Sequence, residues 1–146
     1  MHRDQWFRAL LIAYLVVVLR VTLWPQFADP DALRGLEQAL LWLHQRGLPE
    51  AVDLVVVEAV ANVVMFVPFG VLVPLVLGRR ATVTVLLGAL LSAAIELTQL
   101  AFLADRVPTV QDVVMNTLGA AVGVTALVLL RTAVRRRRNA SIRWDP

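Results

Sequence analysis

Long apolar runs alternate with short polar segments along the chain, and this pattern sets the expected architecture. Four runs, at about residues 6–24, 54–77, 81–103 and 110–130, carry few charged side chains. Each matches the roughly 20 residues that an α-helix needs to cross the hydrocarbon core of a bilayer. The pattern predicts an all-α integral membrane bundle of four transmembrane helices. We expect residues 1–130 to form one membrane domain and residues 131–146 a basic tail.

Composition supports this interpretation and narrows the chemistry. Of the 146 residues, 59% are hydrophobic, whereas about 45–50% is usual for a soluble domain. The chain has no cysteine, and its two histidines, His2 and His44, lie far apart and outside the apolar runs. We therefore expect no disulfide, no metal site and no cofactor.

The arginines predict the orientation in the membrane. Arg3 and Arg8 lie at the start of the first run, residues 79–80 are a second basic pair, and Arg135–Arg138 follow the fourth run. The loop 25–53 is more acidic than basic. Because basic residues accumulate on the cytoplasmic side, we expect a multi-pass protein of the cytoplasmic membrane with both termini inside. The basic tail should contact anionic lipids of the inner leaflet rather than nucleic acid.

The long outer loop contains signals for a helix of its own. Asp29 before Pro30 is typical of a helix start, and Gly47 followed by Pro49 is typical of a stop. Leucines recur between them at helical spacing, with polar residues on the other side. The pattern predicts a short amphipathic helix, on the outer leaflet or across the mouth of the bundle. A re-entrant segment is the alternative.

Polar side chains within the four runs gather at one depth, near the predicted outer ends. With Arg106 in the adjoining loop, they are Arg20, Glu58, Asn62, Glu96, Gln99, Asp112 and Asn116. An ionised side chain costs about 2.5–3.5 kcal/mol near the membrane centre on insertion scales, so their common depth is informative. We expect an outward-facing ligand pocket in which the two arginines pair with the carboxylates.

The same residues also have structural interpretations. Thr109 to Asp112 fits a capping box, so Asp112 could serve to cap the last transmembrane helix. Arg20 could extend to the outer head groups. The three amide side chains could join helices by hydrogen bonds, worth roughly 0.6–2 kcal/mol each.

Prolines and glycines give further expectations about shape. Pro68, followed by Gly70, should interrupt the second helix, free the carbonyl of Val64 and open the bundle at the floor of the pocket. Gly119 and Gly123 form a G-x-x-x-G pair. We expect this pair to pack the fourth transmembrane helix closely against the third.

Several of these residues together resemble the VanZ-like family. The resemblance rests on Asn62-Val-Val-Met-Phe66-Val-Pro68-Phe69-Gly70, Glu96-Leu-Thr-Gln99, Arg106, and Asp112-Val-Val-Met-Asn116-Thr-Leu-Gly119. These segments occur in the family's order and spacing, and Thr22 and Pro25 also suit it, so the similarity runs from about Thr22 to Gly123. The family is bacterial and takes its name from a protein associated with teicoplanin resistance. The resemblance thus implies a cell-envelope role and lowered glycopeptide susceptibility.

Four functions fit the sequence. The leading hypothesis is a binding protein whose pocket holds the head of a lipid or of a lipid-linked wall precursor, with the arginines on phosphate or carboxylate. An enzyme using Glu96 or Asp112 as general acid or base is the second. A transporter is the third, and because the inner halves of the helices lack polar residues it would require an oligomer. A structural subunit held together by its polar network is the fourth.

Overall fold

The computed structural model describes residues 2–23, 30–103 and 109–142, which form five α-helices and no strand. In chain order these are α1 (His2–Leu23), α2 (Pro30–His44), α3 (Leu54–Leu77), α4 (Ala81–Phe102) and α5 (Val110–Ile142). All except α2 are long and apolar enough to cross a membrane. The predicted all-α bundle of four transmembrane helices plus a short amphipathic helix is confirmed.

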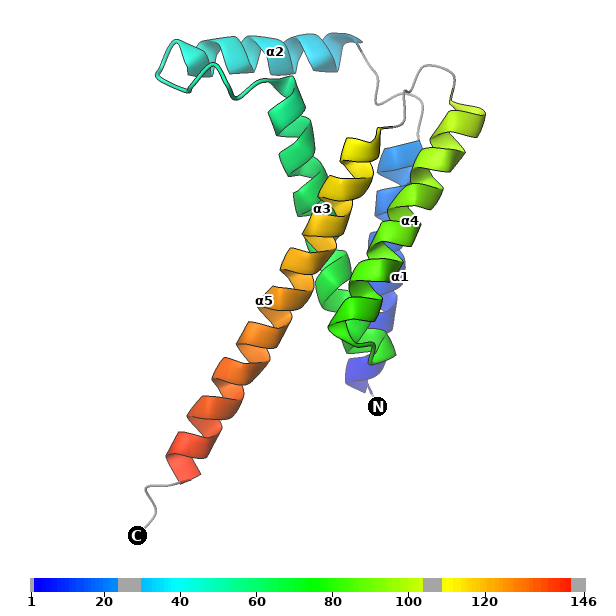
Figure 1. The fold of residues 1–146 in the computed structure, drawn as a ribbon, viewed down its shortest axis with the longest axis vertical. Helices are drawn as coiled ribbons and strands as arrows, with labels where there is room; N and C mark the ends of the chain where they lie inside the picture. The colour runs from blue at the N-terminus through cyan, green and yellow to red at the C-terminus, as the bar shows by residue number, and fades with distance from the viewer. Residues whose placement is uncertain (1, 24–29, 104–108, 143–146) are drawn as a thin grey trace.

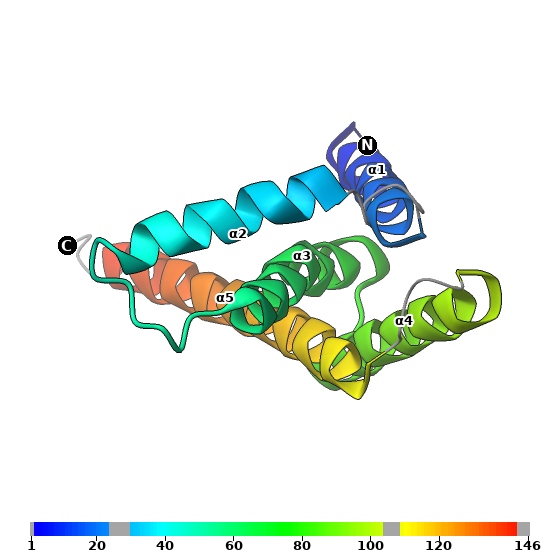
Figure 2. The ribbon, with the colours of Figure 1, turned by 90° about the horizontal axis from the view of Figure 1, so that it is seen from above.

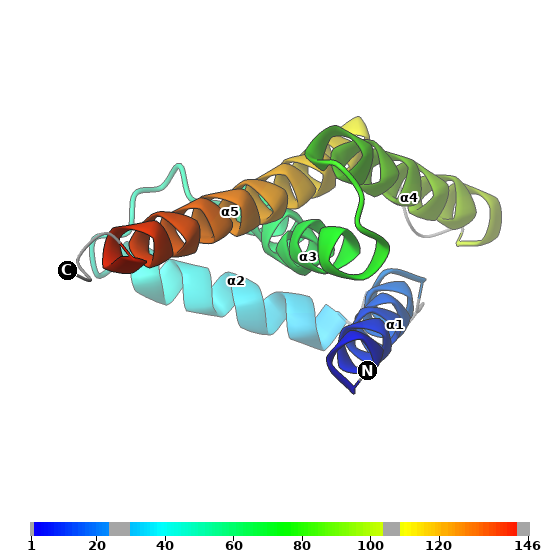
Figure 3. The same cartoon turned by 90° about the horizontal axis from the view of Figure 1, so that it is seen from below.

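The long helices α1, α3, α4 and α5 run along the bundle, and α2 lies across one end of it (Figure 1). Helix α5 packs on α3 and α4, and α1 packs on α3 and α4. Seen from above, α2 runs beside α3 and does not cover α4 (Figure 2). From below, α5 runs away from α1 and α4 toward its last residues (Figure 3). We call the end nearest α2 the polar end, and the end at the turn with Arg79 and Arg80 the arginine end.

Helix α3 has clear signals at both of its ends. The Asp53 carboxylate accepts a hydrogen bond from Val56 N at 2.9 Å, and Gly78 adopts a left-handed backbone with φ 60°. These are ordinary N-cap and C-cap arrangements, and they place the helix at the predicted residues. The helix continues through Pro68 and Pro74, so Pro68 does not end it, and the bend expected there stays a prediction. A single missing N–H removes one intrahelical bond, and neighbouring helices keep the rest in place.

Glycines bring α3 and α5 into backbone contact. A Cβ added at Gly119 would meet the carbonyl oxygen of Val63, and one at Gly70 would meet that of Ala120. Phe66 is fully buried at the same level. The two helices therefore touch where the sequence predicted an opening below the polar residues, and the expected opening between them is wrong.

The G-x-x-x-G pair has a different partner from the one expected. Both Gly119 and Gly123 approach carbonyl oxygens of α3, not α4. Helix α4 meets α5 on a neighbouring face, where a Cβ built at Gly88 would lie 2.8 Å from the Ala120 side chain. Small-residue spacing identifies a close-packing face but not which helix covers it, since any neighbour can use it.

Helix α4 has polar residues inside and apolar residues outside. Its buried residues lie on one stripe: Thr84, Gly88, Ser92, Ile95, Glu96 and Gln99. Its exposed stripe is leucine-rich, and Leu90 and Leu97 are 67% and 66% exposed. Exposed leucine suits a helix that faces lipid, because the solvent around it is then hydrocarbon.

Helix α2 is amphipathic, and it runs across the bundle end as one continuous helix instead of forming a re-entrant segment. Leu40 is buried, whereas Leu41 and Trp42 are exposed. The guanidinium carbon of Arg46 lies 3.3 Å from the centre of the Trp42 ring. Exposed leucine and tryptophan beside a cation suit a helix at a membrane surface. The predicted cap at Asp29 lies outside the described residues.

Helix α5 extends beyond its predicted transmembrane run. The apolar pattern ends at Leu130, but the helix continues to Ile142. Arginine is a good helix former, so the hydrogen-bonded helix does not have to end where the apolar pattern ends. The first residues of the predicted tail are thus helical, and the division into a domain and a tail stays a prediction.

Candidate functional site

Polar side chains from three helices form hydrogen bonds at the polar end. We call it the polar cluster: Asn62 of α3, Ser92, Glu96 and Gln99 of α4, and Asp112 and Asn116 of α5. All but Ser92 were predicted as pocket residues. The sequence signal for Ser92 is its spacing: it lies one turn before Glu96, and both residues are buried on the same face of α4.

Asn62 and Asp112 join α3 to α5. The Asn62 side-chain amide donates a hydrogen bond to the Asp112 carboxylate, with 2.6 Å between nitrogen and oxygen. Both side chains are half-buried. A bond this short to a carboxylate is typical of charge-assisted pairs, which are stronger than neutral ones.

The start of α5 is half of a capping box. Thr109 Oγ1 accepts a hydrogen bond from Asp112 N at 3.1 Å, as the predicted box requires. The reciprocal bond comes from a different residue, because Thr109 N donates to Glu96 Oε2 of α4 at 3.1 Å. Glu96 is 9% exposed. The Asp112 side chain bonds to Asn62 on another helix, so the reciprocal half of the box is supplied by Glu96 instead of Asp112.

Gln99 joins α4 to α1. Its side-chain amide donates to the Thr22 carbonyl oxygen at 2.8 Å, and both residues are buried. Thr22 Oγ1 donates to Val18 O at 2.8 Å within α1. Farther from the polar end, Tyr14 OH of α1 donates to Met65 O of α3 at 2.8 Å. Sequence reasoning missed Tyr14, since a lone tyrosine in an apolar run gives no partner.

Asn116 lies one turn deeper than Asp112 and has an unsatisfied atom. Its side-chain nitrogen donates to Ser92 Oγ at 2.8 Å, and the residues are 3% and 0% exposed. Its Oδ1 is buried and has no hydrogen-bond partner among the described residues. Leaving a buried acceptor unpaired costs about 1–3 kcal/mol. A hydrogen-bond donor on a ligand could pair with this unsatisfied oxygen.

Two other predicted residues, Glu58 and Arg20, lie outside the polar cluster. Glu58 is exposed on the first turns of α3. Arg20 is exposed on α1, on the face opposite Val18 and Thr22. Arg106 lies outside the described residues. The expected pairing of arginines with the carboxylates thus stays a prediction, and within the described residues no three acidic, histidine or cysteine side chains gather as metal ligands.

The fold and the inward-facing polar stripe define a multi-pass membrane protein. A model of the family described as VanZ/LLP1 matches residues 11–131. Because this match covers most of the chain, the protein belongs to the VanZ-like family. No curated protein and no solved structure matches the chain significantly.

Proposed function

We propose that this protein binds the head group of a lipid-linked cell-wall precursor at the polar cluster, from the outer leaflet of the bacterial cytoplasmic membrane. The observation that carries the proposal is the buried Oδ1 of Asn116, which has no partner among the described residues and lies one turn from the carboxylate of Asp112. Polar groups within a membrane bundle commonly mark a functional site, because apolar residues would pack there at lower free energy.

The chemistry of the cluster favours a ligand rich in hydrogen-bond donors. Asp112 and Glu96 each accept a hydrogen bond, and the Oδ1 of Asn116 is a further acceptor that has no partner among the described residues. The hydroxyl and amide groups of a sugar–peptide head would supply donors to such a set. Arg20 and Arg106, which the sequence predicts near the outer ends of the transmembrane helices, would then bind the phosphates. Binding of the head would mask it from a glycopeptide and would thereby lower teicoplanin susceptibility.

A structural role is the second candidate, and the hydrogen bonds favour it. The links Asn62–Asp112, Glu96–Thr109 and Gln99–Thr22 connect α1, α3, α4 and α5 at one end of the bundle. On this view the cluster stabilises the helix arrangement and binds nothing. The two candidates differ in what happens to binding when stability is preserved.

The test compares binding of two lipids by purified protein in detergent. The probes are a polyprenyl-diphosphate-linked sugar–peptide and the same polyprenyl phosphate without the head, measured by native mass spectrometry. Wild type should retain the first at least tenfold better than the second, and Glu96→Gln should lose that preference. Leu97→Ala, on the adjacent exposed face, is the matched control. Equal retention of both lipids by the folded wild type would refute the proposal.

A further inference from the structure

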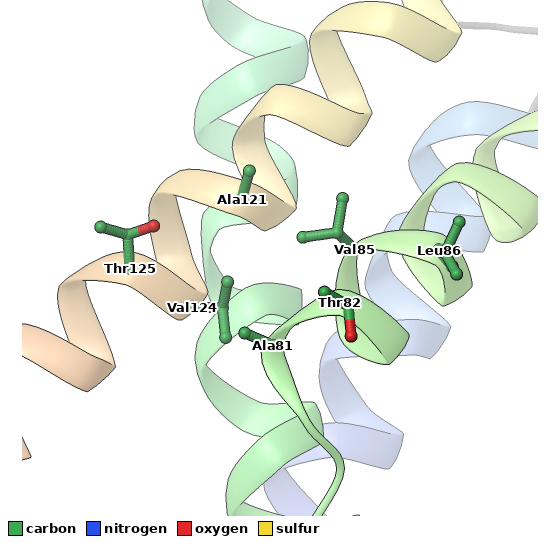
Figure 4. Close-up of a pocket in the computed structure, with 7 residues that line it drawn as sticks. All are labelled: Ala81, Thr82, Val85, Leu86, Ala121, Val124 and Thr125. Atoms are coloured by element: carbon green, nitrogen blue, oxygen red, sulfur yellow. The ribbon is translucent and has the colours of Figure 1, made fainter.

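A second feature lies at the arginine end, away from the polar cluster. An apolar groove of about 520 Å³ separates the first turns of α4 from the middle of α5 (Figure 4). Thr82, Val85 and Leu86 line it from α4, and Ala121, Val124 and Thr125 line it from α5. The close contact of Gly88 with Ala120 bounds it toward the polar end.

The groove opens on the part of the surface that faces the bilayer. Leu86 is 63% exposed, and the side chains drawn in Figure 4 are aliphatic apart from two threonine hydroxyls. An empty apolar groove at this depth would forfeit van der Waals contacts along both helices. A flexible hydrocarbon chain can restore those contacts without bringing any polar group into the membrane.

The mouth of the groove is basic. Arg79 and Arg80 immediately precede its first residues and are exposed. Neither forms an ion pair or hydrogen bond through its side chain among the described residues. The sequence has no acidic residue between Glu58 and Glu96 or from Val113 to Ile142, so α3, α4 and α5 bring no carboxylate to this end. Two guanidinium groups at the end of an apolar groove, with no ion-pair partner among the described residues, match an anionic phospholipid.

We propose that this groove holds one acyl chain of an anionic phospholipid in the leaflet at the arginine end, with the phosphate bound by Arg79 and Arg80. This site is independent of the proposed head-group site, because it lies at the opposite end of α4. It also differs from a diffuse attraction of the Arg135–Arg138 run to the membrane surface, since it requires one lipid in a defined position. The lipid would fill the gap between α4 and α5.

The test uses the full chain purified in a mild detergent with phosphatidylglycerol added, and counts retained lipids by native mass spectrometry. Wild type should retain one phosphatidylglycerol in preference to phosphatidylcholine by at least fivefold. Val85→Trp, which fills the groove, should abolish retention, as should the pair Arg79→Gln and Arg80→Gln. The control pair Arg137→Gln and Arg138→Gln removes the same charge and should retain the lipid.

Besides unchanged retention in a groove-filling variant, two results would overturn this proposal. One is equal loss of phosphatidylglycerol in both arginine pairs, which would show attraction to charge alone. The other is a wild-type dimer that Val85→Trp converts to a monomer, which would show that a second copy occupies the groove. Ala121→Leu, a smaller replacement, provides a second groove-filling variant if Val85→Trp fails to fold, and unchanged retention in it would also count against the site.

Discussion

The side-chain nitrogen of Asn62 lies 2.6 Å from the carboxylate of Asp112, so a hydrogen bond joins α3 to α5 at the polar end. Replacing Asn62 by leucine leaves a half-buried carboxylate without this donor. We expect a loss of about 1–2 kcal/mol in the free energy of unfolding, in the upper range for interhelical bonds in membranes. Unfolding in mixed micelles with increasing dodecyl sulfate measures it.

The double variant Asn62→Leu with Asp112→Leu sharpens this prediction. Removing both partners eliminates the unpaired carboxylate, so most of the lost stability should return. Val64→Ala is the control on the lipid-facing side of α3, where the side chain is 62% exposed. If Asn62→Leu costs no more than Val64→Ala, the bond contributes nothing to stability.

Gly123 sits against the backbone of α3, so any side chain there should separate the two helices. A Cβ would collide with the carbonyl oxygen of Val67. Overpacking typically costs about 1–3 kcal/mol, and we expect Gly123→Ala to fall in that range, measured by the same unfolding assay. Gly35→Ala in α2 meets nothing within 4 Å and should be neutral or slightly stabilising. Equal effects at the two sites would contradict the packing.

The predicted orientation can be tested directly because the chain has no cysteine. Gln111→Cys places an exposed thiol at the start of α5, at the polar end, and Arg79→Cys places one at the arginine end. A membrane-impermeant maleimide should label Gln111→Cys in intact spheroplasts, and label Arg79→Cys only after permeabilisation. The reverse pattern would invert the protein and move the polar cluster to the cytoplasmic side.

The sequence predicts depth well and lateral neighbours poorly. Helix α3 runs from Leu54 to Leu77 as expected, because apolar length, the Asp53 cap and Gly78 all fix its ends. The polar residues of α4 were expected together near one end of that helix, and the structure buries Glu96 and Gln99 at the polar end. These properties depend on the position of a residue along one helix, and this position follows directly from the order of residues in the sequence.

Contacts between helices depend on the rotation of each helix about its own axis and on which helices are neighbours. A single sequence determines neither of these directly. Gly119 was expected on α4 but faces α3. Glu58 lies one turn before Asn62, yet only Asn62 reaches α5, while Glu58 is exposed near the start of α3. The reciprocal bond of the capping box was expected within α5 but comes from Glu96. Local spacing could not show that a residue on another helix would compete for the same N–H.

The most direct test of head-group binding replaces the deepest polar pair, Ser92 and Asn116, by alanine and leucine. This double variant removes both hydrogen-bond partners and the orphaned Oδ1, so packing should be preserved and stability unchanged or raised. The measurement is retention of the lipid-linked sugar–peptide, with unfolding followed on the same samples. Our account predicts wild-type stability or better with binding reduced at least tenfold. Reduced stability with unchanged binding would contradict it and make the cluster a structural network.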